Sequence, residues 1–189
     1  MTTDLKQEYA GQFSMTESLV YAVFSTPLGW IAAMASAKGL VAATLPQRSE
    51  EHALMALGQS VENVRQDNGA FEDLAARLKA YFEGRRVDFA DKLDLSAGTS
   101  FQQRVWEATR RVPYGETRSY LWIAKQIKRP RAARAVGQAL GANPLPIIVP
   151  CHRVIATDGG LGGFGGGLGV KRMLLRLEGA SVVKNGPLV

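Results

Sequence analysis

Residues 120–142, YLWIAKQIKRPRAARAVGQALGA, decide the fold that we expect for the second half of the chain. Apolar residues recur at helical spacing over about 120–127, which predicts a first short helix. The KRP sequence at 128–130 ends this helix, because proline lacks an N–H and disfavours helix in the residue before it. A second helix is expected over about 131–142. Two short helices around a tight break, on a basic background, predict a helix-turn-helix.

The helix expected over 131–142 has an unusual outer face. The stripe opposite its apolar residues consists of Ala133, Arg134, Gly137, Gln138 and Gly141. A solvent-exposed helix face normally carries charged and polar residues instead. Because a glycine inside a helix costs about 1 kcal/mol relative to alanine, two of them require a reason. Close approach of this helix to another surface and tight packing against a neighbouring helix are both open explanations.

The first half of the chain predicts a small sheet with helices. Residues 19–45 are rich in β-forming residues and are punctuated by PLG and AKG, which indicates three short antiparallel strands. Helices are expected over about 50–57 and 70–82, and residues 85–98 connect to the second half. The expected class is α/β, more closely α+β. It has a small N-terminal antiparallel sheet with helices, then a mostly helical helix-turn-helix domain of winged-helix-like type.

Helix signals continue through the second half. Thr99 precedes Gln102 by three residues, which is the pattern of a capping box at a helix start. A final helix is expected over about 170–177, after a glycine-rich stretch. We therefore expect two domains, an N-terminal α/β domain at 1–95 and a C-terminal DNA-binding domain at 96–189.

Composition limits the class of protein. With 46% hydrophobic and 21% charged residues, the chain can build a core and is expected to be soluble and globular. No apolar run reaches the roughly 18 residues of a membrane span, and the N-terminal MTTDLKQEYAGQF lacks a signal-peptide pattern. A single cysteine cannot form an internal disulfide, so a reducing cytoplasm is expected. One cysteine and two histidines also disfavour a zinc site, and no metal is expected.

Charge is distributed unevenly along the chain. Residues 1–98 hold 9 Lys/Arg against 13 Asp/Glu, whereas residues 99–189 hold 14 against 4. The formal net charge of +6 is thus concentrated in the second half. A solvated basic face is one explanation. A nucleic acid partner is the other, because Lys and Arg bind phosphates and release counterions.

The stretch IIVPCHRV at 147–154 holds the only cysteine and one of the two histidines. A free thiol has a pKa of about 8.5 and needs a base or positive surroundings to react as a thiolate. His152 adjoins Cys151, and Glu178 could orient the imidazole after the glycine-rich stretch at 158–169 folds back. Local chemistry alone leaves a buried inert cysteine, a redox sensor and a nucleophile open.

Several motifs occur in order around this cysteine. SY at 119–120 and RAVGQALGANP at 134–144 precede NPLPIIVPCHRV at 143–154, and GGLGGFGGGLGVKRMLLRLEG follows at 159–179. In this combination the chain resembles the O6-alkylguanine-DNA alkyltransferase family, the methylated-DNA–protein-cysteine methyltransferases. The resemblance covers roughly residues 98–179. The first half is similar more loosely, to the ribonuclease H-like domain of that family.

The resemblance implies DNA repair by irreversible alkyl transfer to the protein itself. The alkyl group would pass from O6-alkylguanine, and less well from O4-alkylthymine, in double-stranded DNA to Cys151. One event per chain and no cofactor are implied. A monomer is expected, with clustering on DNA left open, and no membrane partner. The alternative within the same fold is a non-catalytic lesion sensor, but such relatives replace the cysteine.

Catalytic roles are implied for five residues. Cys151 is the alkyl acceptor, His152 takes the thiol proton through a water, and Glu178 holds His152. Asn143 ties the second helix of the helix-turn-helix to the cysteine turn. Tyr120 hydrogen-bonds a ring nitrogen of guanine and crowds the backbone so that the nucleotide rotates. The implied pocket residues are Pro146, Leu140, Val154, Phe164 and Gly165.

The resemblance also gives the small-residue helix face a purpose. A lesion inside a duplex must be flipped out before a thiol can reach it. Members of this family place the second helix in the minor groove, which is only about 6 Å wide, so a nearly bare helix face is needed. Arg134 would fill the space that the nucleotide leaves. The implied DNA contacts are Arg134, Tyr120, Ala133, Gly137, Gln138, Gly141 and Arg153.

Some positions depart from the family pattern. Lys128-Arg129 stands where a glycine is usual, Phe164 replaces a common tyrosine, and Gly165 stands where a serine can occur. The preferred alkyl size is therefore open. A transcriptional regulator is a rival, although a face of Ala, Gly and one Arg offers few base-reading side chains. A cysteine hydrolase is another, but no oxyanion hole is evident in the sequence.

Overall fold

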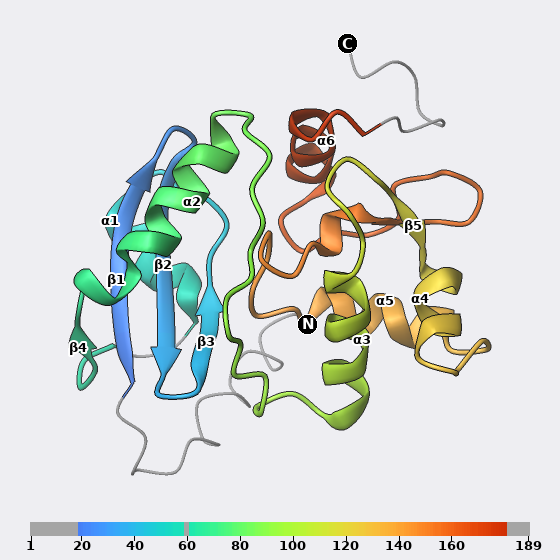
Figure 1. Ribbon diagram of the computed structural model, residues 1–189, viewed down its shortest axis with the longest axis horizontal. Coiled ribbons are helices and arrows are strands. Elements are labelled where there is room, and N and C mark those ends of the chain that lie inside the picture. Colours follow the sequence, from blue (N-terminus) through green and yellow to red (C-terminus); the bar gives the residue numbers. More distant parts are fainter. Residues whose placement is uncertain (1–18, 59–60, 181–189) are drawn as a thin grey trace. The chain divides into compact units, whose positions relative to one another are not determined.

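The structure is a computed structural model that describes residues 19–58 and 61–180 (Figure 1). The chain separates into two compact units, one up to Ala97 and one from Gly98. The N-terminal stretch tested for a signal peptide and the tail after Ala180 lie outside the described residues. Within the described ranges, no helix is long and apolar enough to cross a membrane.

The first unit is built on a four-stranded sheet. Strands β1 (Val20–Thr26), β2 (Gly29–Ser36) and β3 (Gly39–Ala43) are antiparallel neighbours, as the sequence predicted. Strand β4 (Arg65–Gln66) adds to β1 in parallel, so the order is β3-β2-β1-β4 and the sheet is mixed. The three antiparallel strands were predicted from the sequence, whereas the parallel addition of β4 was not. Two exposed polar residues carry no apolar alternation by which a strand could be found.

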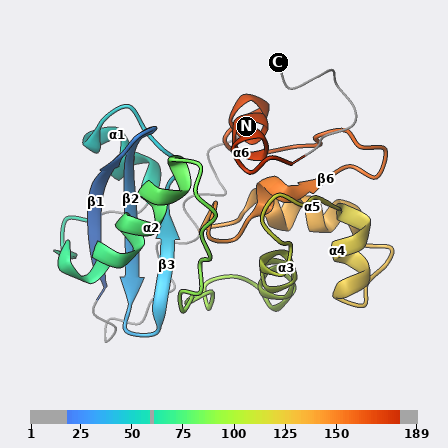
Figure 2. The ribbon, with the colours of Figure 1, turned by 45° about the horizontal axis from the view of Figure 1, so that its top comes forward.

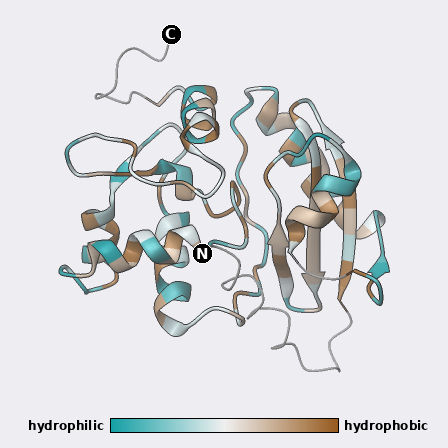
Figure 3. Ribbon diagram, turned by 180° about the vertical axis from the view of Figure 1, so that it is seen from behind, coloured by the Kyte–Doolittle hydropathy of each residue, from teal (hydrophilic) through white to brown (hydrophobic). Residues whose placement is uncertain are grey.

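Helices cover both faces of this sheet. Helix α1 (Glu50–Leu57) lies on one side, and helix α2 (Glu72–Phe82), which follows a 3-10 turn at Gly69–Phe71, lies on the other (Figures 1 and 2). Successive residues in the middle of β2, at 31–34, are all buried, as expected for a strand covered on both faces. Apolar residues accordingly gather along the strands in Figure 3.

The second unit contains three helices packed on one another. They are α3 (Ser100–Arg110), α4 (Tyr120–Gln126) and α5 (Ala133–Gly141) (Figure 2). The predicted capping box of Thr99 and Gln102 is confirmed at the start of α3. The indole Nε1 of Trp106 donates to the Ala139 carbonyl at 2.8 Å, which fixes α3 against α5.

The turn between α4 and α5 contains an unfavourable backbone conformation. Lys128 takes φ 57, in the left-handed region that glycine adopts without steric cost. Lys128 belongs to the Lys128-Arg129 pair that, by the sequence resemblance, stands where a glycine is usual. The lysine side chain is exposed, so the departure adds positive charge to the surface of the turn.

The rest of the second unit consists of a two-stranded parallel sheet, a short 3-10 helix and a last helix. Strand β5 (Arg118–Ser119) pairs in parallel with β6 (Val154–Ile155), which follows a short 3-10 helix at Cys151–Arg153. Helix α6 (Leu168–Leu177) closes the described chain. The expected α+β class, with a small sheet and helices followed by a mostly helical part, is confirmed.

Candidate active site

Asn143 builds the turn that presents the cysteine. Its Oδ1 accepts from the Leu145 N–H at 3.0 Å, and its Nδ2 donates to the Val149 carbonyl at 2.9 Å. The same Nδ2 lies 3.1 Å from Cys151 Sγ. Because Asn143 directly follows the end of α5, these contacts fix the sulfur relative to that helix.

The cysteine turn contains a strained residue. Ile147 has φ 76, and β-branched side chains clash with the backbone in this region. Such a conformation costs about 1–3 kcal/mol and persists only where the surroundings enforce it. Ile147 is almost completely buried, so packing around the turn holds the strained geometry.

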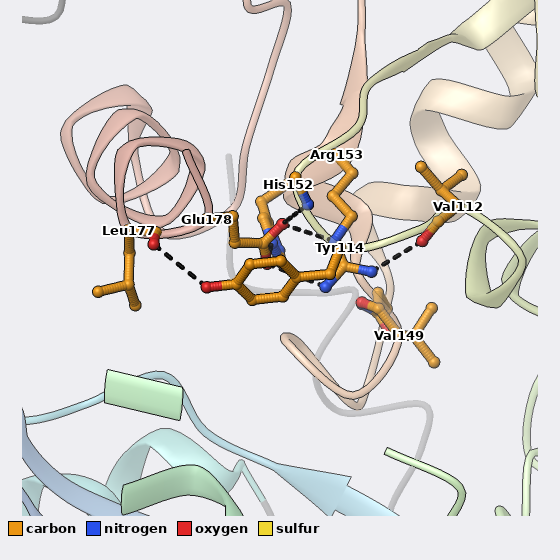
Figure 4. A network of polar contacts seen from close by, with 9 residues as sticks. Val112, Tyr114, Val149, His152, Arg153, Leu177 and Glu178 are labelled. Atoms are coloured by element: carbon orange, nitrogen blue, oxygen red, sulfur yellow. Dashed lines mark hydrogen bonds and ion pairs between the residues drawn. The ribbon is translucent and has the colours of Figure 1, made fainter. Parts of the chain in front are cut away.

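The two residues that follow the cysteine, His152 and Arg153, both bind one carboxylate, that of Glu178 (Figure 4). His152 Nε2 lies 2.8 Å from Glu178 Oε1. Arg153 donates from Nε to Oε2 at 2.8 Å and from Nη2 to Oε1 at 2.9 Å. Its Nη1 donates to the Val112 carbonyl at 2.7 Å. The three residues therefore form a buried network in which Glu178 is shared.

The turn after α3 also contacts this network, through Tyr114 and Gly115. Tyr114 donates from its hydroxyl to the Leu177 carbonyl at 3.2 Å, and its ring lies 5.7 Å from the Arg153 guanidinium (Figure 4). The Gly115 N–H donates to Glu178 Oε2 at 3.2 Å. Gly115 has φ 77, and a Cβ there would lie 2.9 Å from the Glu178 carbonyl, so this close approach requires glycine.

Burial and the Glu178 network act in opposite directions on the protonation state of His152. Burial alone would raise the pKa of Glu178, but hydrogen bonds from His152 and Arg153 outweigh it and lower the pKa to about 2. Burial lowers the pKa of His152, against the opposing effect of Glu178. His152 is therefore neutral at pH 7. Because Nε2 donates to an ionised carboxylate, the basic lone pair is on Nδ1.

The thiol itself is protonated at neutral pH. Burial raises the pKa of Cys151, and this outweighs the opposing hydrogen bond from Asn143 and the positive charge of Lys171. A reaction at this sulfur therefore needs a base to remove the proton at the moment of attack. A neutral imidazole beside the cysteine can supply that base.

Cys151 is buried but lines an open cavity. Its side chain is 8% exposed, and it lies in the wall of a cavity of about 680 Å³. This volume falls in the range that accommodates small organic molecules. The lining residues are Tyr120, Ala133, Arg134, Gly137, Gln138, Leu140, Gly141, Cys151, Ala156, Thr157, Gly163, Phe164 and Gly165.

The outer face of α5 forms one side of this cavity. Among the described residues, no atom would lie within 4 Å of a Cβ at Gly141, and a Cβ at Gly137 would make ordinary contact with the Tyr120 ring at 3.6 Å. Packing within the described part of the chain therefore does not demand these glycines. Of the two explanations that the sequence left open, tight packing against a neighbouring helix is not supported. The bare face is available to an external surface.

The structure separates the expected site residues into groups. Ten of them line the cavity: Tyr120, Ala133, Arg134, Gly137, Gln138, Leu140, Gly141, Cys151, Phe164 and Gly165. Asn143 contacts the sulfur, and His152, the residue after Cys151, contacts Glu178. Pro146 is half-buried and bridges to Val149, and Val154 is fully buried; neither is among the residues that line the cavity. The pocket roles expected for Pro146 and for the backbone of Val154 stay predictions.

Arg153 requires a correction. It was expected to contact DNA, but it is 7% exposed and its guanidinium is occupied by Glu178 and the Val112 carbonyl. A phosphate could reach this group only by breaking a buried ion pair, which is strongly unfavourable. The structure assigns Arg153 to the support of Glu178.

Other residues of the site were not found from the sequence. Ala156, Thr157 and Gly163 line the cavity, and Lys171 is completely buried beneath it. Lysine is almost never fully buried, so a lysine in an amphipathic helix is normally assigned to the surface. Within the described ranges, no group of three or more His, Cys, Asp and Glu side chains could hold a metal ion.

The Glu178 network predicts a specific acid sensitivity. A carboxyl whose pKa is about 2 when folded and 4.5 when unfolded stabilises the fold fully above pH 4.5, by about 3 kcal/mol. That contribution is lost as the pH falls towards 2, because the unfolded state then binds the proton more readily. We expect urea unfolding of the Glu178→Gln variant to converge on the wild type between pH 4.5 and 2. A stability difference that stays constant over this range would contradict the network.

Two family models match the chain. The model described as 6-O-methylguanine DNA methyltransferase, ribonuclease-like domain, matches residues 19–95. The model described as 6-O-methylguanine DNA methyltransferase, DNA binding domain, matches residues 100–180. Together they span most of the described chain.

Curated relatives and solved structures agree with these models. A methylated-DNA–protein-cysteine methyltransferase of Methanosarcina acetivorans is 41% identical over 86% of this chain and 99% of its own length. A protein of the same name from Mycobacterium leprae is 58% identical over 59% of this chain and 67% of its own. The crystal structure of Mycobacterium tuberculosis OGT in complex with DNA is 45% identical, with a TM-score of 0.72 over 85% of this chain and 92% of that one.

Proposed function

Because the chain belongs to the methylated-DNA–protein-cysteine methyltransferase family, we propose that it repairs DNA by moving the alkyl group of O6-alkylguanine onto Cys151. The resemblance seen in the sequence motifs is thereby confirmed at the level of the family. The observation that carries the proposal for this chain is the position of its only cysteine. Cys151 lies in the wall of a cavity that begins at the small-residue face of α5.

The proposed reaction is a displacement at carbon. His152 Nδ1 accepts the thiol proton through a bridging water, and Glu178 stabilises the imidazolium that forms. The sulfur electron pair forms a bond to the alkyl carbon while the bond from that carbon to O6 breaks. The electrons of the broken bond pass into the guanine ring, which becomes ordinary guanine after protonation. The thioether is stable, so each chain reacts once.

Tyr120 is the residue proposed to assist the leaving base. It lines the cavity, and burial raises the pKa of its hydroxyl, so the phenol keeps its proton and can donate it in a hydrogen bond. In this structure the hydroxyl donates to the Gly163 carbonyl at 3.3 Å. A guanine ring nitrogen in the cavity would take the place of that carbonyl and gain stabilisation as negative charge develops.

The DNA is proposed to lie along α5. A minor groove about 6 Å wide admits a helix only if its face is nearly bare, and Ala133, Gly137 and Gly141 provide such a face. Gln138 and Arg134 are exposed on the same side, and Arg134 would enter the base stack when the lesion flips out.

Phosphate contacts are proposed for the basic surface around α3, α4 and α5. The exposed basic residues there are Arg104, Arg111, Lys125, Lys128, Arg129 and Arg131. Contacts of this kind position a protein on a duplex without reading its sequence, which suits the repair of damage at any site.

A direct test is the mass of the protein after exposure to damaged DNA. Incubation with a duplex containing O6-methylguanine is expected to add one methyl group per chain, on the peptide that contains Cys151, and to leave unmodified guanine in the DNA. An undamaged duplex of the same sequence is the control. Binding of the damaged duplex with no change in mass would instead identify a lesion-binding protein. Repeated turnover with release of a free product would identify a hydrolase.

A further inference from the structure

Lys171 is a buried cation to which the proposed reaction gives no role. It lies in α6 and its side chain is completely buried. Its Nζ donates to three carbonyls, those of Val154 at 2.6 Å, Leu161 at 2.5 Å and Gly163 at 3.3 Å. Among the described residues, no carboxylate forms an ion pair with this ammonium, so backbone oxygens alone satisfy its charge.

Two of these carbonyls belong to the segment at 156–167, which we call the glycine loop. This loop supplies Gly163, Phe164 and Gly165 to the cavity wall. The hydrogen bonds within the loop lie at its two ends. At 156–160 they include that from the Ala156 N–H to the Gly160 carbonyl at 2.7 Å, and at 164–167 the Gly167 N–H donates to the Phe164 carbonyl at 3.0 Å. A glycine-rich segment loses much conformational entropy when it is ordered, so an external anchor is needed.

The anchored loop lies directly against Tyr120. The Gly163 carbonyl accepts hydrogen bonds from both Lys171 Nζ and the Tyr120 hydroxyl. A Cβ at Gly162 would lie 2.7 Å from that hydroxyl, and Gly162 has φ 66, so only glycine allows this approach. The ammonium also lies 5.8 Å from the centre of the Tyr120 ring. The glycine loop, Lys171 and Tyr120 are therefore all in contact with one another.

Burying the Lys171 ammonium disfavours its charged form, and its lowered pKa reflects this. Burial lowers the pKa of Lys171 from 10.5 to about 8, although the nearby Cys151 opposes the shift. A lysine kept in so unfavourable a position must contribute something that a neutral side chain of the same size could not. An ammonium can donate three hydrogen bonds at once, and here two of its three acceptors are carbonyls of the glycine loop.

We propose that Lys171 is a positioning residue that holds the glycine loop against Tyr120 and so forms the wall of the cavity in which the alkylated base binds. The identity of the base rests on the proposed function, whereas the loop contact does not. Lys171 acts here through the loop, since Nζ contacts backbone carbonyls and is absent from the cavity lining.

A competing role for Lys171 is electrostatic. Its positive charge lowers the pKa of Cys151, although burial has the larger, opposite effect. The two roles differ in what they predict for a small thiol reagent. If the role is electrostatic, removing Lys171 should slow the alkylation of Cys151 by iodoacetamide, a reagent that needs no ordered loop. If the role is positioning, removing Lys171 should leave that rate nearly unchanged and weaken the binding of a purine.

The test uses the full-length Lys171→Met variant, which keeps an unbranched side chain of nearly the same length and removes the donors. Arg172→Met is the matched control, because it removes a neighbouring cation of α6 that, among the described residues, forms no hydrogen bond to the loop. Hydrogen exchange at 157–167 is expected to accelerate about tenfold in Lys171→Met, through loss of the anchoring hydrogen bonds, and not in the control. In the reaction with free O6-benzylguanine, the apparent dissociation constant of the base is expected to rise about tenfold in Lys171→Met, with a smaller change in the maximal rate of transfer.

Three outcomes would overturn the proposal. One is loop exchange that is unchanged in Lys171→Met while transfer is lost, which would indicate a direct part in the chemistry. Another is a fall in iodoacetamide reactivity in proportion to the loss of transfer. The third is an equal effect in Arg172→Met. Because exchange is measured without DNA, a chain that shows the loop effect and transfers no alkyl group would count against the proposed function alone.

A measurement on the unmodified protein covers the case in which Lys171→Met does not fold. The titratable groups that face Lys171 are Cys151, Tyr120 and His152. Burial raises the pKa of the first two and lowers that of the third, so of these four neighbouring groups it is Lys171, with a pKa of about 8, that changes charge between pH 7 and 9. Exchange in the glycine loop, relative to α3, is expected to increase over this range as one donor is lost. A constant ratio would contradict the proposal.

Discussion

Replacing Cys151 with alanine is expected to abolish alkyl transfer while the fold and the binding of damaged duplex are retained. The sulfur is the only thiol of the chain, so no other side chain can form a stable thioether. Loss of a nucleophile typically lowers the rate by at least about three orders of magnitude. The protein mass after incubation with O6-methylguanine duplex measures the effect.

Cys151→Ala should cost little stability. The side chain is small, and its polar contact in the structure is with Asn143 Nδ2, which keeps the Val149 carbonyl as an acceptor. The variant is therefore a clean probe of chemistry. The matched variant is His152→Gln, which keeps the thiol and removes the base, and should slow transfer without abolishing it. Methylation of any residue in Cys151→Ala at the wild-type rate would refute the assignment of the acceptor.

The helices were predictable because their ends carry local signals. Thr99 and Ser119 accept from the N–H groups of Gln102 and Trp122, and α3 and α4 start at the residues that follow these caps. Helix α5 begins two residues later than expected, at Ala133; its N-cap residue, Ala132, has no side-chain oxygen that could mark this start in the sequence. Strand β4 was missed because its pairing depends on β1, which lies far away in the sequence.

The site was less accessible to sequence reasoning than the helices. Nothing local relates His152 to Glu178, which lies 26 residues further along the chain. The contact could be suggested only by supposing that the glycine-rich stretch folds back, and by the family resemblance; the structure gives it as 2.8 Å. Arg153 and Lys171 were misjudged or overlooked for one reason: basic side chains are usually exposed, and a buried one is stabilised by partners that only the fold brings together.

Arg134→Ala is expected to slow repair of duplex DNA far more than transfer from free O6-benzylguanine. Flipping a nucleotide out of a duplex costs a few kcal/mol, and a side chain that fills the vacated space recovers part of it. Loss of about 2 kcal/mol of that support would slow duplex repair roughly 30-fold. A free base needs no flipping, so its transfer should change less than about twofold. Single-turnover rates with the two substrates give the ratio.

The appropriate control is Arg131→Ala, which removes an exposed positive charge just before the start of α5. A phosphate contact contributes binding that falls with salt, so this variant should weaken duplex binding and lower its salt dependence. It should leave the rate at saturating duplex unchanged, because Arg131 is absent from the cavity lining. Arg134, by contrast, lines the cavity and should affect the rate even at saturation. Equal losses on duplex and free base for Arg134→Ala would show that this arginine acts on the pocket and not on the base stack.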